Sequence, residues 1–258
     1  MNNNNELGSE NFSLYSMNKK EKNDFINSKL KSLFNHHISK SLNYKKMMTS
    51  IGFDIKNITS LEKLPYLPVR LFKLYELKSV ENSQIIKTMT SSGTTGQQVS
   101  KIYIDKLTSV IQTKVLSKIM SSFIGKSRAP MIIIDSEETV KNRKKFSART
   151  AGILGFSMFG SRKVYALNND MTLNYERVND FVKQHIDKSI LVFGFTSIVY
   201  QHFYKELKKN NLKLNLSNGV LIHGGGWKKL TNIAVDSKTF RKNLKSVCNI
   251  NRVHDYYG

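Results

Sequence analysis

A short segment rich in hydroxyl groups and glycine has the residue types best suited to binding phosphate. It reads Thr-Met-Thr-Ser-Ser-Gly-Thr-Thr-Gly over residues 88–96, directly after a run that favours a strand. A loop that holds a triphosphate needs inward-facing backbone N–H groups, glycines where the ligand approaches closely, and small hydroxyls that donate to phosphate oxygens. The segment offers all three, although Gly93 and Gly96 are too close together for a Walker loop. A flexible Ser/Thr turn is the alternative, and the residues that we expect to bind phosphate are Ser91, Ser92, Gly93, Thr94, Thr95 and Gly96.

A second glycine cluster reads His-Gly-Gly-Gly-Trp-Lys-Lys over residues 223–229 and follows the apolar run 220–222, which favours a strand. Open α/β sheets bind ligands at the carboxyl ends of their strands, and bare glycine backbone lets a planar ring such as adenine approach. One alternative, the oxyanion loop of an esterase, lacks the Gly-x-Ser-x-Gly elbow that such enzymes need. The other is a tightly packed turn in which the tryptophan covers the core. The residues that we expect to bind a nucleotide here are His223, Gly224, Gly225, Gly226, Trp227 and Lys228.

The hydroxyl-rich segment carries a family resemblance. Residues 90–96 resemble the phosphate-binding signature of the adenylate-forming enzymes, which include acyl-CoA synthetases, adenylation domains and LuxE-type acyl-protein synthetases. Many acyl-CoA ligases continue with proline and lysine, whereas residues 98–105 resemble the acyl-protein synthetase version. The upstream residues 64–69 and 72–73 and the Gly-Gly-Gly-Trp-Lys run at 224–228 are similar to the same family.

The last four residues, Asp-Tyr-Tyr-Gly at 255–258, resemble the aromatic-glycine element that stacks on adenine in these enzymes. The resemblance therefore assigns Tyr257 and Gly258 to the nucleotide site. In the family pattern an acidic residue that helps to hold magnesium follows shortly after this glycine, and the sequence given ends before it. The ribose-binding aspartate, the hinge and the small C-terminal lid are missing as well. We expect either the front part of a longer enzyme or a natural short form, with the resemblance covering residues 60–258.

The resemblance implies an enzyme that uses ATP and Mg²⁺ to activate a carboxylic acid, a fatty acid, as an acyl-adenylate. It then implies transfer of the acyl group to a protein thiol, with an acyl reductase as a possible acceptor partner. Thr94, Thr95 and Lys101 are the residues expected to stabilise the charge that develops on the phosphates. Two alternatives are a CoA ligase of the phenylacetate type and a catalytically silent fragment that binds a nucleotide or another polyanion.

A third segment, residues 192–196, joins an expected strand to an expected helix. Its aromatic side chains flank a glycine, so the segment could form the floor of an acyl pocket, and a packed core turn is the alternative. Thr196 is placed to cap the helix N-terminus. The residues assigned to the acyl pocket are Phe193, Gly194, Phe195 and Thr196.

The composition is that of a folded, strongly basic protein. The 258 residues carry a formal net charge of +22, and 33 lysines and 8 arginines are spread along the chain. This spread differs from a phosphate-reading surface, so we expect no nucleic-acid partner. Cys248, the single cysteine, favours a reducing compartment and a buried apolar role, and the six histidines have no metal-ligand spacing. No apolar run approaches the roughly 20 residues of a membrane helix, so we expect a cytoplasmic protein without integral membrane association and without a protein-held metal.

Short apolar runs alternate with longer segments of helical period after residue 81, which is typical of α/β proteins. The strands lack polar alternation, as in Met-Ile-Ile-Ile at 131–134, and this indicates burial on both faces of a sheet. We expect mixed or parallel sheets flanked by helices, as in the large N-terminal domain of adenylate-forming enzymes. The expected strands are 84–89, 130–135, 162–167, 189–193 and 219–223. The expected helices are 105–122, 144–154, 174–187, 197–210 and 236–248.

Three regions are expected along the chain. The polar residues 1–17 are expected to be a disordered tail. Residues 18–80 form a helical N-terminal segment, with an amphipathic pattern over 18–48 and a boundary at the two prolines of 64–69. Residues 81–258 form the nucleotide- and acyl-binding core, so that 18–258 make an incomplete N-terminal adenylate-forming domain without the C-terminal lid.

Overall fold

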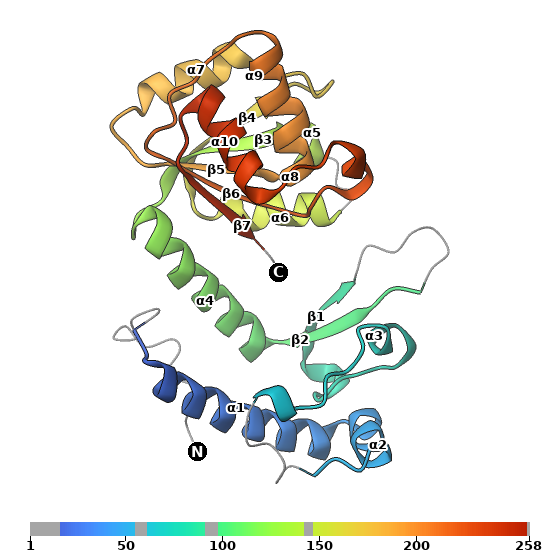
Figure 1. The fold of residues 1–258 in the computed structure, drawn as a ribbon. Coiled ribbons are helices and arrows are strands. Elements are labelled where there is room, and N and C mark those ends of the chain that lie inside the picture. The colour runs from blue at the N-terminus through green and yellow to red at the C-terminus, as the bar shows by residue number, and fades with distance from the viewer. Residues whose placement is uncertain (1–15, 55–60, 91–97, 142–146, 257–258) are drawn as a thin grey trace. The chain divides into compact units, whose positions relative to one another are not determined.

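The computed structural model describes residues 16–54, 61–90, 98–141 and 147–256. The chain forms two compact units, Met1–Ile119 and Met120–Gly258. The division falls inside one helix, α4, which spans Lys106–Ile124. Figure 1 shows the two units, with the first in blue to green and the second in green to red. The domain limits expected from the sequence stay a prediction.

The first unit begins with two helices that cover a small apolar core. The expected helix over 18–48 is divided at Ser41, which ends α1 and whose hydroxyl accepts from the backbone of Tyr44 at the start of α2. Phe34 and Met48 form the buried centre of this core. An antiparallel hairpin completes the unit. The elements are α1 (Lys19–Lys40), α2 (Leu42–Ser50), the 3₁₀ turns Leu61–Lys63 and Asn82–Gln84, α3 (Leu71–Leu74), β1 (Ile85–Thr90) and β2 (Lys101–Asp105).

The second unit is a five-stranded parallel sheet with helices on both faces, which confirms the expected α/β class. The strand order is β4-β3-β5-β6-β7. The strands are β3 (Ala129–Ser136), β4 (Gly160–Leu167), β5 (Ile190–Phe195), β6 (Gly219–Gly224) and β7 (Arg252–Tyr256). The helices are α5 (Glu138–Lys141), α6 (Ala148–Ser157), α7 (Tyr175–Gln184), α8 (Thr196–Ile198), a π-helix (Val199–Tyr204), α9 (Lys205–Lys209), a 3₁₀ segment (Lys228–Ile233) and α10 (Ser237–Cys248).

The sheet carries the core because its strands are apolar on both faces. All eight residues of β3 are buried. On one face, side chains such as Val192 pack with α7, the π-helix, α9 and α10 in a single hydrophobic cluster. On the other face, Phe156 of α6 stacks on Phe193 with ring centroids 4.4 Å apart. Figure 1 shows α7, α9 and α10 on one side of the sheet of this unit and α6 on the other side.

The order of the strands defines where a ligand crevice forms. From β3 the chain passes to β4 on one side and then crosses to β5 on the other side. Strand order therefore reverses between β3 and β5, and open α/β sheets bind ligands at the carboxyl ends of the strands at such a point. The residues that end β3, β5 and β6 are therefore the candidates for contact with a ligand.

Some elements differ from those expected. The strands β2 and β7 had not been expected, and the expected helix 197–210 is divided into α8, the π-helix and α9. Helix α6 begins at Ala148, where Ser147 accepts a capping hydrogen bond from the Thr150 backbone. Among the helices of the described residues, none combines the length and apolar character that spanning a bilayer would require.

Candidate functional site

The ends of three neighbouring strands bring two of the predicted segments together. In the sheet register, Ile134 pairs with Gly194, and Phe195 pairs with Gly224. The predicted acyl segment and the second glycine cluster therefore lie side by side at the carboxyl edge. The predicted phosphate-binding residues 91–96, and Tyr257 and Gly258, lie outside the described residues, so their roles stay predictions. Lys101 is exposed at the start of β2 in the first unit.

The three glycines after His223 serve different purposes. A Cβ on Gly224 would lie 2.5 Å from the carbonyl oxygen of Tyr256. A Cβ on Gly225, whose φ is +79°, would lie 2.5 Å from Cδ1 of Phe195. Gly226 has a φ of +60° and has nothing within 4 Å of the Cβ position. The protein itself therefore fills the space beside the first two glycines, and Gly226 keeps an open side.

Trp227 faces the core rather than the open turn. Its ring packs edge-on against Tyr200, with centroids 4.9 Å apart, and against Phe240 at 6.1 Å. It lies at the border of the main hydrophobic cluster. This placement agrees with the alternative interpretation, in which the tryptophan of a tightly packed turn covers the core. Nucleotide binding by Trp227 and Lys228 stays a prediction.

Thr196 does not cap the helix that follows it, which corrects the sequence-based expectation. Phe195 occupies the N-cap position of α8 and makes no side-chain cap bond. The Thr196 hydroxyl instead donates to the carbonyl oxygen of Gly224 at 3.1 Å and lies 2.9 Å from Nδ1 of His223. Because the hydroxyl has one proton and the carbonyl can only accept, the His223 ring must donate from Nδ1. The hydroxyl thus joins the ends of β5 and β6.

His223 is a buried neutral imidazole. Burial lowers the pKa of its ring, and the opposing attraction of Asp255, whose Oδ1 is 3.8 Å from Nδ1, is smaller. Thr196 and Asp255 both approach Nδ1. A serine-hydrolase relay needs the acid and the nucleophile on opposite ring nitrogens. This arrangement gives no such relay, in agreement with the missing esterase elbow.

The lowered pKa of His223 predicts a loss of stability in mild acid. Above the ordinary pKa of 6.5 the ring is neutral in both the folded and unfolded states. Below it the unfolded state binds the proton first, so the free energy of unfolding falls as pH decreases toward the folded-state pKa. Urea unfolding at about pH 7.5 and pH 5.5 should therefore show a smaller acid loss for His223→Gln than for the parent protein. Equal losses in the two proteins would contradict this reading.

Only one of the predicted acyl-pocket aromatics reaches the edge of the sheet. Phe193 is 2% exposed and stacks within the core. A Cβ on Gly194 would lie 2.7 Å from Val199 and 3.0 Å from Cβ of Ile134, so this glycine is needed for packing. Phe195 is half-buried and lies edge-on to Phe193. Among these residues, Phe195 is the one placed to contact a ligand, and an acyl-binding role stays a prediction.

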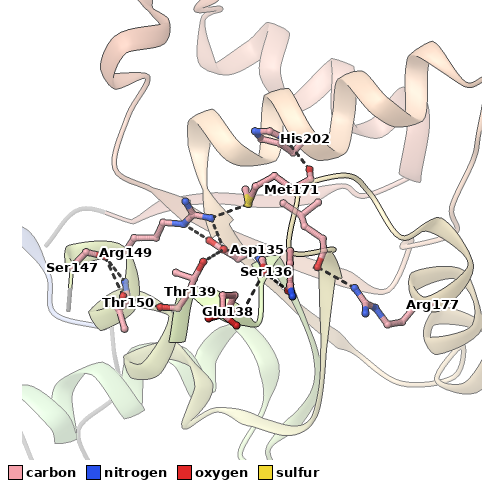
Figure 2. A network of polar contacts seen from close by, with 12 residues as sticks. Asp135, Ser136, Glu138, Thr139, Ser147, Arg149, Thr150, Met171, Arg177 and His202 are labelled. Atoms are coloured by element: carbon pink, nitrogen blue, oxygen red, sulfur yellow. Dashed lines mark hydrogen bonds and ion pairs between the residues drawn. The ribbon is translucent and has the colours of Figure 1, made fainter. Parts of the chain in front are cut away.

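A polar network that the sequence analysis did not identify lies at the end of β3 (Figure 2). Asp135 is 1% exposed, and the Arg149 guanidinium donates from Nε to Oδ2 and from Nη2 to Oδ1, each at 2.5 Å. The Thr139 hydroxyl and the Ser136 backbone N–H donate to Oδ1 at 2.7 Å. A buried carboxylate is stable only with such partners. An aspartate directly after an apolar strand could have indicated this position, whereas nothing in the sequence links it to Arg149.

The network continues into the loop that follows β4. Arg149 donates from Nη2 to the sulfur of Met171 at 3.4 Å, and the Met171 carbonyl accepts from Nδ1 of His202 in the π-helix at 3.0 Å. Met171 has a φ of +68°, a conformation that is unfavourable for a side chain of this type. Contacts from α6 and from the π-helix therefore hold the strained residue in place from two sides, as Figure 2 shows.

Cys248 is buried and unreactive. It is 1% exposed, its thiol donates to the Leu244 carbonyl at 3.1 Å, and burial raises its pKa to about 12. Because the thiolate is the reactive form, a thiol reagent should modify Cys248 at least about a hundred times more slowly in the native protein than in urea. Stopped-flow labelling with Ellman's reagent measures both rates. Rapid stoichiometric labelling of the native protein would contradict the burial.

The described residues offer no metal site of their own. Within the described ranges, no three histidine, cysteine or carboxylate side chains come together in a group that could hold an ion. Asp135 is already paired with Arg149, and Asp255 on β7 has a side chain that is 72% exposed.

The fold is shared with solved structures of other proteins. Solved structures of a 2-hydroxyisobutyryl-CoA ligase share the fold. The ligase in the postadenylation state with 2-HIB-AMP matches with a TM-score of 0.65 and 14% identity over 97% of this chain and 53% of the ligase. The ligase with 2-HIB-AMP and CoA in the thioesterification state matches with a TM-score of 0.62 and 15% identity over 93% and 49%. The fold is therefore that of an adenylate-forming ligase, and the chain spans about half the length of these proteins.

The sequence identifies the family within this class. Residues 7–258 match the LuxE acyl-protein synthetase family, so the chain belongs to that family. This confirms the resemblance drawn from the hydroxyl-rich segment and the glycine clusters. No functionally curated protein matches the sequence.

Proposed function

We propose that this protein activates a carboxylic acid as an acyl-adenylate, using ATP and Mg²⁺, and passes the acyl group to a protein thiol. The observation that carries the proposal is membership of the LuxE family over residues 7–258, because that match includes the hydroxyl-rich segment and the glycine cluster at 223–229. The carboxyl edge of the sheet supports it, since Phe195 and the Gly224–Gly226 turn meet where α/β sheets bind ligands.

The residues divide the chemistry between them. A carboxylate is a poor electrophile. Its oxygen attacks the α-phosphorus of ATP, the bond from that phosphorus to the oxygen bridging to the β-phosphorus breaks, and pyrophosphate leaves. The product is a mixed anhydride, the acyl-adenylate, from which the thiol later displaces AMP. The hydroxyls and amides of residues 91–96 bind the phosphates, and Thr94, Thr95 and Lys101 offset the growing charge. Magnesium supplies further charge stabilisation when it is bound to the triphosphate. The open side of Gly226, with Tyr257, accepts the adenine ring, and Phe195 contacts the acyl group.

Finer points of the proposal follow from the family. The acid is a fatty acid, the acceptor is a thiol on a partner protein such as an acyl reductase, and the reaction takes place in the cytoplasm. Cys248 is not the acceptor, because its thiol is buried and its pKa is raised to about 12.

Exchange of labelled pyrophosphate into ATP tests the proposal, with the intact protein and a series of straight-chain fatty acids. We expect acid-dependent exchange, and we expect Gly93→Val and Thr94→Val to lower its rate by about a hundredfold or more. Valine at position 93 blocks the close approach of the phosphates, and valine at position 94 lacks the hydroxyl that donates to them. Thr113→Val is the matched control. Its hydroxyl is exposed on α4 and donates to the Ser109 carbonyl, so the exchange rate should change less than about twofold. Absence of exchange with every acid would reject the proposal.

Free CoA is a second possible acceptor. The specific observation that favours it is the fold shared with a CoA ligase. Incubation with the best acid, ATP and either CoA or a partner protein separates the two acceptors. An acyl-CoA product at a rate that matches exchange would replace the protein thiol in the proposal.

A further inference from the structure

Helix α6 is attached to the sheet at two places that lie less than one turn apart. Arg149, in its first turn, makes two hydrogen bonds with Asp135 at the end of β3 (Figure 2). Gly152 lies against the ring of Phe195 at the end of β5, because a Cβ there would be 3.0 Å from Cζ of the ring. Residues three apart on a helix share a face. Both attachments are therefore made by the face of α6 that meets the sheet.

The Phe195 ring fills space that two glycines leave open. It approaches Gly152 with Cζ at its tip, and it approaches the Cβ position of Gly225 with Cδ1 at 2.5 Å. Helix α6 thus contacts one end of the ring, and the turn after β6 contacts its side. A Cβ at Gly225 would overlap the ring, and a Cβ at Gly152 would be a tight contact with its tip, so the ring is held between the turn and α6. A shift of α6 toward the ring, or a methyl group at position 152, should therefore press on the ring and move it relative to Gly225.

The ring and the ion pair both lie where the order of strands reverses. Asp135 follows Ile134, Phe195 follows Gly194, and these two preceding residues are register partners on β3 and β5. The crevice at this point is the ligand site of open α/β sheets. An apolar ring in the crevice suits the hydrocarbon part of a carboxylic acid, whereas phosphate groups need donors and positive charge.

Arginine has the properties needed to fix the helix. Its planar guanidinium forms two parallel bonds to a carboxylate and so fixes orientation as well as distance, whereas a lysine ammonium makes a point contact. The carboxylate of Asp135 is 1% exposed and accepts two further bonds, so it is itself fixed. The pair is therefore a rigid link between β3 and the first turn of α6.

We propose that Arg149 and Gly152 are positioning residues, which hold the Phe195 ring against Gly225 and thereby set where the carboxylic acid lies in the crevice between β3 and β5. This inference rests on the proposed function. Neither residue acts on the reacting atoms. Arg149 acts through α6, and Gly152 acts by leaving room for the ring.

A first measurement follows the ring without using activity. The Phe195 ring lies beside the Gly225 α-protons, so its ring current shifts their NMR resonances, whereas Gly226 has no atom near its Cβ position and serves as the internal reference. Arg149→Lys and Gly152→Ala should both change the Gly225 shift. Gly155→Ala is the matched control, because Gly155 is on the same helix, gains the same helix propensity, and has nothing within 4 Å of its Cβ position. This control should leave the Gly225 shift unchanged.

The second measurement is the pyrophosphate exchange rate as a function of fatty acid and ATP concentration. We expect Arg149→Lys and Gly152→Ala to raise the apparent KM for the acid about tenfold, because small displacements of a bound reactant are costly. The KM for ATP should change less than about twofold, and Gly155→Ala should match the parent protein. A purely structural role would lower the amount of folded enzyme and so reduce the maximal rate, with both KM values unchanged.

Three results would overturn the proposal. If the chemical shift of the Gly225 α-protons is the same in Arg149→Lys and Gly152→Ala as in the parent protein, α6 does not position the ring. A changed shift with an unchanged KM for the acid would show that the ring position does not affect the acid. If the Gly225 shift changes but the parent protein shows no pyrophosphate exchange with any of the acids, the proposed function is the step that failed. The claim about the position of the acid would then fail with it.

Discussion

Arg149→Leu should lower the free energy of unfolding by about 3–5 kcal/mol, because it leaves a buried carboxylate without its countercharge. Asp135 is 1% exposed, whereas the Arg149 side chain is 29% exposed. The guanidinium could therefore reach water after loss of its partner, but the carboxylate could not. The Thr139 hydroxyl and the Ser136 N–H would remain as donors to Oδ1. Two neutral donors do not replace a guanidinium that bonds both oxygens.

Urea unfolding measures this loss and allows two comparisons. Lys141 forms an ion pair with Glu137 at a similar, hydrogen-bonding distance, but both side chains are exposed. Lys141→Leu should therefore change the free energy of unfolding by less than about 0.5 kcal/mol. The double variant Asp135→Leu with Arg149→Leu removes both charges and should recover most of the loss. A loss for Arg149→Leu as small as that for Lys141→Leu would show that the Asp135 carboxylate reaches solvent.

The central strands could be predicted because their sequence reports burial on both faces. The run Met131–Ile134 is uniformly apolar, and the structure buries it completely. The same holds for Val220–Ile222 in β6. Strands at the centre of a parallel sheet have no polar side, so composition alone reveals them. The α/β class followed from these runs and from the helical segments between them.

The strands that had not been expected lie at edges. In β7, Arg252 is exposed and Val253 is buried, and the polar residues that follow are exposed or half-buried. Only one face of such a strand needs apolar residues, so a short, mostly polar strand has too weak a hydrophobic pattern to be recognised from the sequence. Within the described ranges, the strand β2 pairs only with β1, and it is likewise exposed at its first two residues. Pairing with a neighbour, rather than the local pattern, makes both segments into strands.

The candidate site was predictable where a single segment carries the information. The glycines at 224–226 identified a turn after a strand, and the structure places that turn at the carboxyl edge. The contacts that join segments were not predictable. Thr196 forms a hydrogen bond with His223 near the end of β6, which lies 27 residues further along the chain. Asp135 pairs with Arg149, which lies 14 residues further along. Such partners are selected by the register of strands and the rotation of helices, which local spacing does not determine.

Gly224→Ala should lower the free energy of unfolding by about 3 kcal/mol, since the added methyl group meets backbone that cannot move aside. Its Cβ would lie 2.5 Å from the Tyr256 carbonyl oxygen, and Gly224 and Tyr256 are register partners that hold β7 to β6. Relief of the overlap would require these strands to separate at their carboxyl ends.

Gly226→Ala is the matched control for this substitution. It lies two residues away and has no neighbour within 4 Å of the Cβ position, but it has a φ of +60°. The expected cost is that of a left-handed alanine, about 1 kcal/mol. Chemical unfolding of both variants, followed by the fluorescence of Trp227, measures the difference. Equal losses would mean that the contact between the position 224 methyl group and β7 costs no more than a left-handed alanine, so that the strands relieve the overlap by a small movement. A clearly larger loss for Gly224→Ala would instead show that the first glycine of the cluster is needed for the close approach of β6 and β7.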